Sequence, residues 1–132
     1  MNRYLVILFV IATLFSYSCK SNAEGEIQIV TVEEMQELSQ LEDVQLVDVR
    51  TSEESKTGYI ENAQNIDYNS SSFDTEIEKL DKSKPVIVYC KSGNRSAKCA
   101  IKMKDAGFVK IYDLDGGIAK WKYKGYDIKS TP

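Results

Sequence analysis

The chain has 132 residues, with 17 Lys and Arg against 20 Asp and Glu and a formal net charge of −3, which suits one compact domain behind a short leader and argues against nucleic-acid binding. Histidine is absent, so catalysis that depends on a histidine base, as in Cys-His or Ser-His-Asp hydrolysis, is excluded. Only three cysteines are present, which disfavours the usual zinc sites, and we expect neither a metal nor a cofactor.

The first 18 residues have the pattern of a signal peptide. Arg3 supplies a positive charge near the start, and residues 4–15 (YLVILFVIATLF) form an apolar run of the length that signal peptides use. A membrane-spanning helix needs about 20 apolar residues, more than this run contains. We therefore expect residues 1–18 to be a signal peptide and the domain to be extracytoplasmic, in the periplasm or cell envelope.

Two cleavage sites compete after this run. Residues 16–19 (SYSC) resemble a bacterial lipobox, with Ser16 where leucine is usual, and cleavage there would leave a lipidated Cys19 as a membrane anchor. Residues 21–23 (SNA) suit the ordinary signal peptidase, which would release a soluble protein. We favour the lipoprotein, because Cys19 closely follows the apolar run; an uncleaved membrane anchor is a third alternative. Residues 19–26 are small, polar and acidic, as in a tether.

The first half of the domain alternates short strands with short helices. Thr31 with Glu34, and Thr51 with Glu54, form the Thr-x-x-Glu capping boxes that open helices. Gly58 is placed to end the second of these helices. In chain order we predict a strand over residues 27–30, a helix from 31 that includes Met35 and Leu38, a strand over 44–49, a helix over 51–58 and a strand over 63–66.

The second half continues the alternation. We predict a helix over residues 72–80, a strand over 85–89, a helix over 96–106 that Gly107 stops, a strand over 109–112, a tight turn at Gly116 and Gly117, and a final helix in which Trp121 packs as core. Strands that alternate with helices predict an α/β fold, with a central parallel sheet of about five strands and helices on both faces. We assign residues 27–130 to this fold as a single domain.

Residues 89–96 (YCKSGNRS) carry the candidate chemistry. They follow an apolar strand and precede a helix, so Cys90 stands at the carboxyl end of a parallel strand, where such sheets expose functional groups. The N–H groups of a tight loop and the positive end of the next helix favour an anion there. Together with Lys91 and Arg95 they favour the thiolate form of Cys90. A thiolate nucleophile needs no base, which fits a chain without histidine.

Four segments, in this order and spacing, resemble the rhodanese-like (sulfurtransferase) domain family. They are residues 46–50 (LVDVR), 53–66 (EESKTGYIENAQNI), 89–96 and 114–121 (LDGGIAKW). The chain departs from the family pattern at Tyr59, where histidine is usual, and at Glu61, where proline is frequent. The resemblance covers nearly the whole mature chain and implies a rhodanese-like three-layer fold.

The resemblance also implies a reaction. The Cys90 thiolate would take the outer sulfur of thiosulfate or a similar small anionic donor, release sulfite and hold the sulfur as a persulfide, before a thiol, or cyanide in the test tube, accepts it. The family pattern implies a supporting role for Asp48, for which a surface ion pair with Arg50 is the alternative. The substrate-binding residues that it implies are Lys91, Ser92, Gly93, Asn94, Arg95, Ser96 and Arg50.

Loop length separates the closest alternatives. Four residues lie between Cys90 and Arg95, as in the sulfur-transferring branch of the family, whereas its cysteine phosphatases place five there to surround a phosphate-sized group. A phosphatase or arsenate reductase on the same fold is therefore disfavoured. A non-catalytic or carrier module that binds a persulfide or a partner protein stays open, and the sequence does not define the donor, the acceptor or the oligomeric state.

Cys99 lies in the first turns of the helix that follows the loop. We expect it to pack in the core. The alternative is a resolving cysteine that forms a disulfide with Cys90 in an oxidising compartment.

Overall fold

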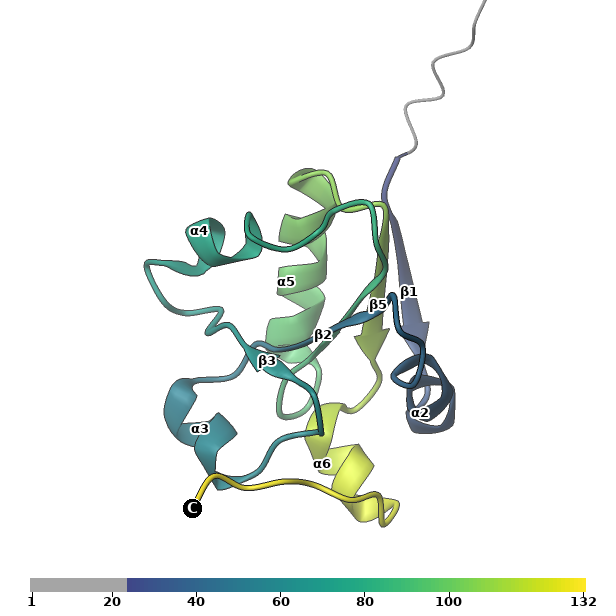
Figure 1. Cartoon of the computed structure of the whole chain (residues 1–132), viewed down its shortest axis with the longest axis vertical. Coiled ribbons are helices and arrows are strands. Elements are labelled where there is room, and N and C mark those ends of the chain that lie inside the picture. The colour runs from purple at the N-terminus through teal and green to yellow at the C-terminus, as the bar shows by residue number, and fades with distance from the viewer. Residues whose placement is uncertain (1–23) are drawn as a thin grey trace, which may run out of the picture.

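A parallel sheet of five strands forms the centre of the computed structural model, which describes residues 24–132 (Figure 1). The spatial order of the strands is β1-β5-β4-β2-β3, and every neighbouring pair is parallel. The predicted α/β fold is confirmed. The predicted signal peptide, the lipidation site Cys19 and residues 19–23 of the predicted tether lie outside the described residues. The strands are β1 (Glu26–Val30), β2 (Gln45–Asp48), β3 (Gln64–Asn65), β4 (Val86–Tyr89) and β5 (Lys110–Leu114).

The helices begin where the sequence supplies caps. Both predicted capping boxes are confirmed, at Thr31 before α2 and at Thr51 before α3. In contrast, α5 begins two residues earlier than predicted, because Gly93 takes a left-handed backbone (φ +112°) that allows the turn to start there. Asn94 and Arg95 therefore belong to the first turn of a helix. The helices are α2 (Val32–Leu38), α3 (Ser52–Thr57), α4 (Phe73–Ile77), α5 (Asn94–Asp105) and α6 (Gly117–Tyr123).

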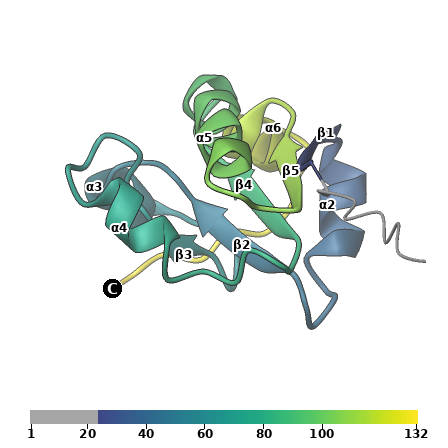
Figure 2. The same ribbon diagram turned by 90° about the horizontal axis from the view of Figure 1, so that it is seen from above.

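Helices cover both faces of the sheet and complete the predicted three layers. Along β4, Val86 and Val88 join the core cluster that contains residues of α4 and α5, while Ile87 and Tyr89 join the cluster that contains residues of α2 and α6. Figure 2 shows α2 at the β1 end of the sheet and α3 and α4 at the β3 end. Trp121 is buried in the second cluster, so its predicted place in the core is confirmed.

The topology places Cys90 at a switch point of the sheet. The central strand β4 is followed by α5 on one face, and its neighbour β5 is followed by α6 on the other. The loops after these two strands therefore leave the sheet toward opposite sides. Open α/β sheets bind ligands at this place, beyond the carboxyl ends of the strands.

Candidate functional site

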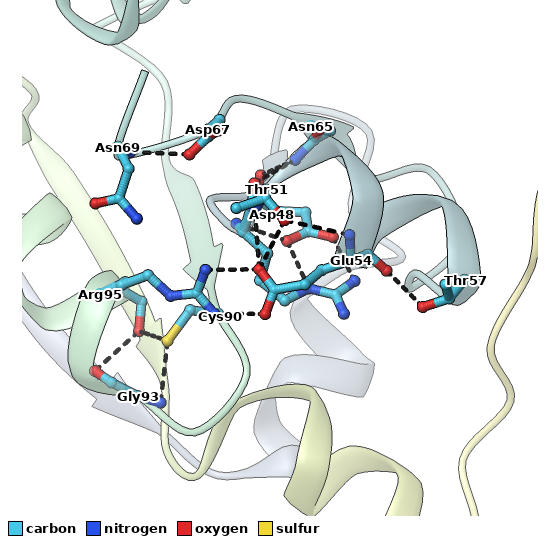
Figure 3. A network of polar contacts seen from close by, with 12 residues as sticks. Asp48, Thr51, Glu54, Thr57, Asn65, Asp67, Asn69, Cys90, Gly93 and Arg95 are labelled. Carbon is cyan, nitrogen blue, oxygen red and sulfur yellow. Dashed lines mark hydrogen bonds and ion pairs between the residues drawn. The ribbon is translucent and has the colours of Figure 1, made fainter. Parts of the chain in front are cut away.

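Cys90 lies in a cradle formed by its own loop. The residue is 1% exposed, and its Sγ accepts a hydrogen bond of 3.0 Å from the Gly93 N–H (Figure 3). The Ser96 hydroxyl lies 3.5 Å from the sulfur. Burial acts to raise the pKa of Cys90, but the Ser96 hydroxyl and the N–H groups of Ser96, Gly93 and Ser92 outweigh it and bring the pKa below its ordinary value. The loop thus favours a thiolate without a base.

We predict that Ser96→Ala raises the pKa of Cys90. The Ser96 hydroxyl accepts from the neutral thiol at 3.5 Å and donates to the Gly93 carbonyl at 3.2 Å, and it can turn to donate to the thiolate, which alanine cannot do. The rate of alkylation by iodoacetamide, measured against pH, should shift to higher pH and fall at pH 7. Cys90→Ser is the control that assigns the signal to Cys90, because burial raises the pKa of the other described thiol, Cys99, to about 12. An unchanged profile would remove Ser96 from the activation of the sulfur.

The start of α6 holds the loop backbone in place. The Ile118 N–H donates to the Cys90 carbonyl at 2.9 Å, and the Ala119 N–H donates to the Lys91 carbonyl at 3.0 Å. Gly117 makes this approach possible, since it has φ +61° and a Cβ there would lie 2.5 Å from both carbonyl oxygens. The predicted turn is present at Asp115 and Gly116, while Gly117 is already the first residue of α6. Sequence analysis missed the contact of Gly117 with the loop, which tertiary packing creates.

The polar side chains of the loop differ in their surroundings. Lys91, Ser92 and Asn94 are exposed, and their side chains form no hydrogen bond or ion pair with the other described residues. Arg95 is half-buried and donates to both carboxylate oxygens of Glu54, at 2.7 and 2.9 Å. These hydrogen bonds lower the pKa of Glu54 to about 2, against the opposing effect of burial. The substrate contacts assigned to these loop residues stay predictions.

A buried ion pair lies at the carboxyl end of β2, next to the end of β4. Asp48 is 0% exposed and Arg50 4%, with Arg50 Nη2 2.6 Å from Asp48 Oδ2 and Arg50 Nε 2.9 Å from Oδ1. Arg50 Nη2 also donates to the Gly58 carbonyl at 2.6 Å. The alternative of a surface ion pair is therefore wrong. These contacts assign Arg50 a structural role, and its contact with substrate stays a prediction.

Tyr89 and Asn65 extend this buried network, and sequence analysis missed both. The Tyr89 hydroxyl donates to Asp48 Oδ2 at 3.2 Å and accepts from the Ile60 N–H at 3.1 Å. The Asn65 amide donates to the carbonyls of Asp48 and Arg50, each at 2.9 Å. A tyrosine at the end of a buried strand was the available signal, because a buried phenol needs a hydrogen-bond partner. The network joins the carboxyl ends of β2 and β4.

Cys99 and Asp113 lie on the buried side of the loop. Cys90 and Cys99 form no disulfide within the described part of the chain, and the predicted core position of Cys99 is confirmed. Asp113, on β5, is buried, and its Oδ1 has no hydrogen-bond partner among residues 24–132. Burial raises the pKa of Asp113, and the nearby Ser96 hydroxyl opposes that shift. A carboxyl group in this setting is less costly to bury protonated than ionised.

Asp113→Asn should therefore stabilise the protein at neutral pH by on the order of 1 kcal/mol, because the amide cannot ionise. Folding raises the pKa of Asp113. The stability of the fold therefore falls progressively as pH rises above the pKa that Asp113 has in the unfolded chain. The gain should therefore vanish at a pH low enough to protonate the carboxyl in both states. Urea unfolding of the parent and of Asp113→Asn across this pH range measures the difference in their free energies of unfolding. A difference that is the same at every pH would contradict the account.

Within residues 24–132, no helix is both long enough and apolar enough to cross a membrane. Nor do these residues group three or more Cys, Asp or Glu side chains as ligands for a metal ion.

Comparison with known proteins gives consistent matches. Residues 31–124 match the family described as "Rhodanese-like domain". The chain is 32% identical over 93 residues to a "Sulfurtransferase" of Allochromatium vinosum, covering 70% of this chain and 85% of the relative. It is 35% identical over 86 residues to a "Thiosulfate sulfurtransferase GlpE" of Coxiella burnetii, covering 65% and 78%. The structure of a rhodanese-related protein from Thermoplasma volcanium is similar with a TM-score of 0.70 and 28% identity, covering 79% of this chain and 99% of that chain.

Proposed function

Because the chain belongs to the rhodanese-like domain family, we propose that it is a sulfurtransferase that carries a sulfane sulfur on Cys90. The observation that carries this proposal is the cradle around the sulfur, with the Gly93 N–H at 3.0 Å and the Ser96 hydroxyl at 3.5 Å. The names of two relatives, a sulfurtransferase and a thiosulfate sulfurtransferase, support the same reaction class.

The reaction has two displacements. In the first, the Cys90 thiolate attacks the outer sulfur of the donor, a bond forms between the two sulfurs, and the donor's S–S bond breaks as sulfite or another leaving group departs with the electron pair. In the second, an acceptor thiolate or cyanide attacks the outer sulfur of the persulfide, and the Cys90 thiolate leaves. Loop N–H groups stabilise the anionic sulfur in both steps, and the exposed Lys91 attracts the anionic donor.

Parallel assays separate this function from its alternatives. We expect turnover of thiosulfate with cyanide, none with p-nitrophenyl phosphate or arsenate, and loss of turnover in Cys90→Ser. Hydrolysis of the phosphate ester would favour the phosphatase instead. A Cys90 persulfide that forms once but passes its sulfur to neither cyanide nor a small thiol would favour the carrier module.

We also propose an extracytoplasmic location, with a lipid anchor at Cys19, on the sequence pattern of residues 1–23. Fractionation of cells that produce the full chain tests it, with Cys19→Ala as the matched variant. The parent should be recovered with membranes and the variant in the soluble fraction or uncleaved. Recovery of the parent in the soluble periplasmic fraction would favour cleavage after Ala23.

A further inference from the structure

Three cationic side chains belong to the candidate site, and two of them already have carboxylate partners. Arg50 is buried against Asp48, and Arg95 is paired with Glu54. Lys91 has no carboxylate oxygen within 4 Å among the described residues. Each of the two ion pairs has no net charge. With Cys90 ionised, its thiolate offsets the Lys91 ammonium, so the net side-chain charge of the site is about zero.

Glu54 is held firmly in its place beside Arg95. Its Oε2 accepts hydrogen bonds from the Thr51 N–H and the Thr51 hydroxyl, each at 3.0 Å, as part of the capping box of α3. Figure 3 shows the Arg95 side chain directed at Glu54, while the Cys90 sulfur lies beside Gly93. The low pKa of Glu54, about 2, keeps the carboxylate charged at any working pH. This negative charge is therefore a permanent part of the site.

The consequence depends on the charge of the donor. Thiosulfate is a dianion, so it would enter a site of no net side-chain charge with Glu54 close by. If Arg95 turned toward the dianion, it would leave the Glu54 carboxylate unpaired near two negative charges. A donor with one negative charge meets half of this repulsion, and Lys91 with the loop N–H groups suffices to bind it.

Resting on the proposed sulfurtransferase function, we propose that Glu54 makes the Cys90 site selective for sulfane-sulfur donors that carry one negative charge, such as a persulfide anion whose other groups have no net charge, over dianionic thiosulfate. The transfer is the same in both cases: the Cys90–sulfur bond forms, the donor's S–S bond breaks, and the thiolate, sulfinate or sulfite leaves with the electron pair. Only the electrostatic work of bringing the donor to the thiolate differs.

Two donors of nearly equal shape isolate the charge. The methanethiosulfonate anion resembles thiosulfate with one charged oxygen replaced by methyl, and its transfer releases methanesulfinate. Initial rates with cyanide as acceptor give kcat/KM for each donor in the parent, in Glu54→Gln and in Glu53→Gln. Glutamine preserves the capping box, and Glu53→Gln removes the same charge from the adjacent, exposed position, where Glu53 forms no side-chain hydrogen bond or ion pair within the described chain.

The parent should have a higher kcat/KM for methanethiosulfonate than for thiosulfate. Glu54→Gln should raise kcat/KM about tenfold for thiosulfate and about threefold for methanethiosulfonate, because the repulsion scales with donor charge. Glu53→Gln should change either value by less than about twofold. Glu54→Asp, which keeps the charge and alters the geometry, should retain the selectivity and so separates charge from misfolding.

Other results would overturn the inference. Equal changes for both donors in Glu54→Gln would mean that Glu54 acts on the reactivity of Cys90, and a fall with thiosulfate would mean that it holds Arg95 for catalysis. The mass of the parent after each donor distinguishes these outcomes from failure of the proposed function. A sulfur adduct on Cys90 without charge selectivity refutes only the role of Glu54, whereas no adduct from either donor refutes the sulfurtransferase itself.

Discussion

Replacing Asp48 with alanine should lower the free energy of unfolding by about 3–5 kcal/mol, one of the largest effects expected of a single substitution in this protein. The Asp48 carboxylate accepts hydrogen bonds from the Arg50 N–H, from the Arg50 guanidinium and from the Tyr89 hydroxyl. Its removal leaves the Arg50 guanidinium buried without a counter-charge. Urea denaturation, followed by circular dichroism, measures the loss.

An exposed ion pair supplies the control. Glu78 lies 2.8 Å from Lys82 on the surface, and Glu78→Ala should reduce stability by less than about 1 kcal/mol. If Asp48→Ala were no more destabilising than Glu78→Ala, the buried network would not stabilise the contact between the carboxyl ends of β2 and β4.

Replacing Gly117 with alanine should reduce sulfur transfer at least about 100-fold, because the new methyl group displaces the loop that holds Cys90. The Cβ would lie 2.5 Å from the carbonyl oxygens of Cys90 and Lys91, too close for either backbone to keep its position. The left-handed backbone of Gly117, with φ +61°, adds strain for any other residue. Turnover of thiosulfate with cyanide, compared at equal folded concentration, measures the loss.

Gly125 provides a matched control for this strain. It has φ +84°, and a Cβ added to it would meet no heavy atom of the described residues within 4 Å, so Gly125→Ala introduces the backbone strain without the clash. It should lose about 1–2 kcal/mol of stability and keep its activity. Equal activity losses in the two variants would contradict the role of Gly117 in supporting the loop.

Local features were predictable from sequence because short-range physics determines them. The Thr31 and Thr51 capping boxes lie within four residues of chain, and both are present in the structure. The apolar run before Cys90 predicted a strand over residues 85–89, and β4 is present there with all four of its residues buried. The start of α5 was misplaced because the left-handed conformation of Gly93 let the helix begin at Asn94, and a glycine signals such freedom without saying whether it is used.

The surroundings of Cys90 were predictable only in part. The sequence places the cysteine, the loop and the two positive residues together, since they are neighbours in the chain. The pairing of Arg95 with Glu54 spans 41 residues, and so does the contact between Tyr89 and Asp48. Such contacts depend on the order of strands in the sheet, which alternation of strands and helices does not define. The capping role of Glu54 was visible in the sequence, while its pairing with Arg95 was not.

The mass of the intact protein after reaction with a sulfane-sulfur donor tests the central claim most directly. Incubation of the parent and of Cys90→Ser with thiosulfate, and separately with methanethiosulfonate, should add about 32 Da, the mass of one sulfur atom, to the parent alone. Subsequent addition of cyanide should remove the adduct. An equal adduct on Cys90→Ser, or none on the parent with either donor, would contradict a Cys90 persulfide as the basis of function.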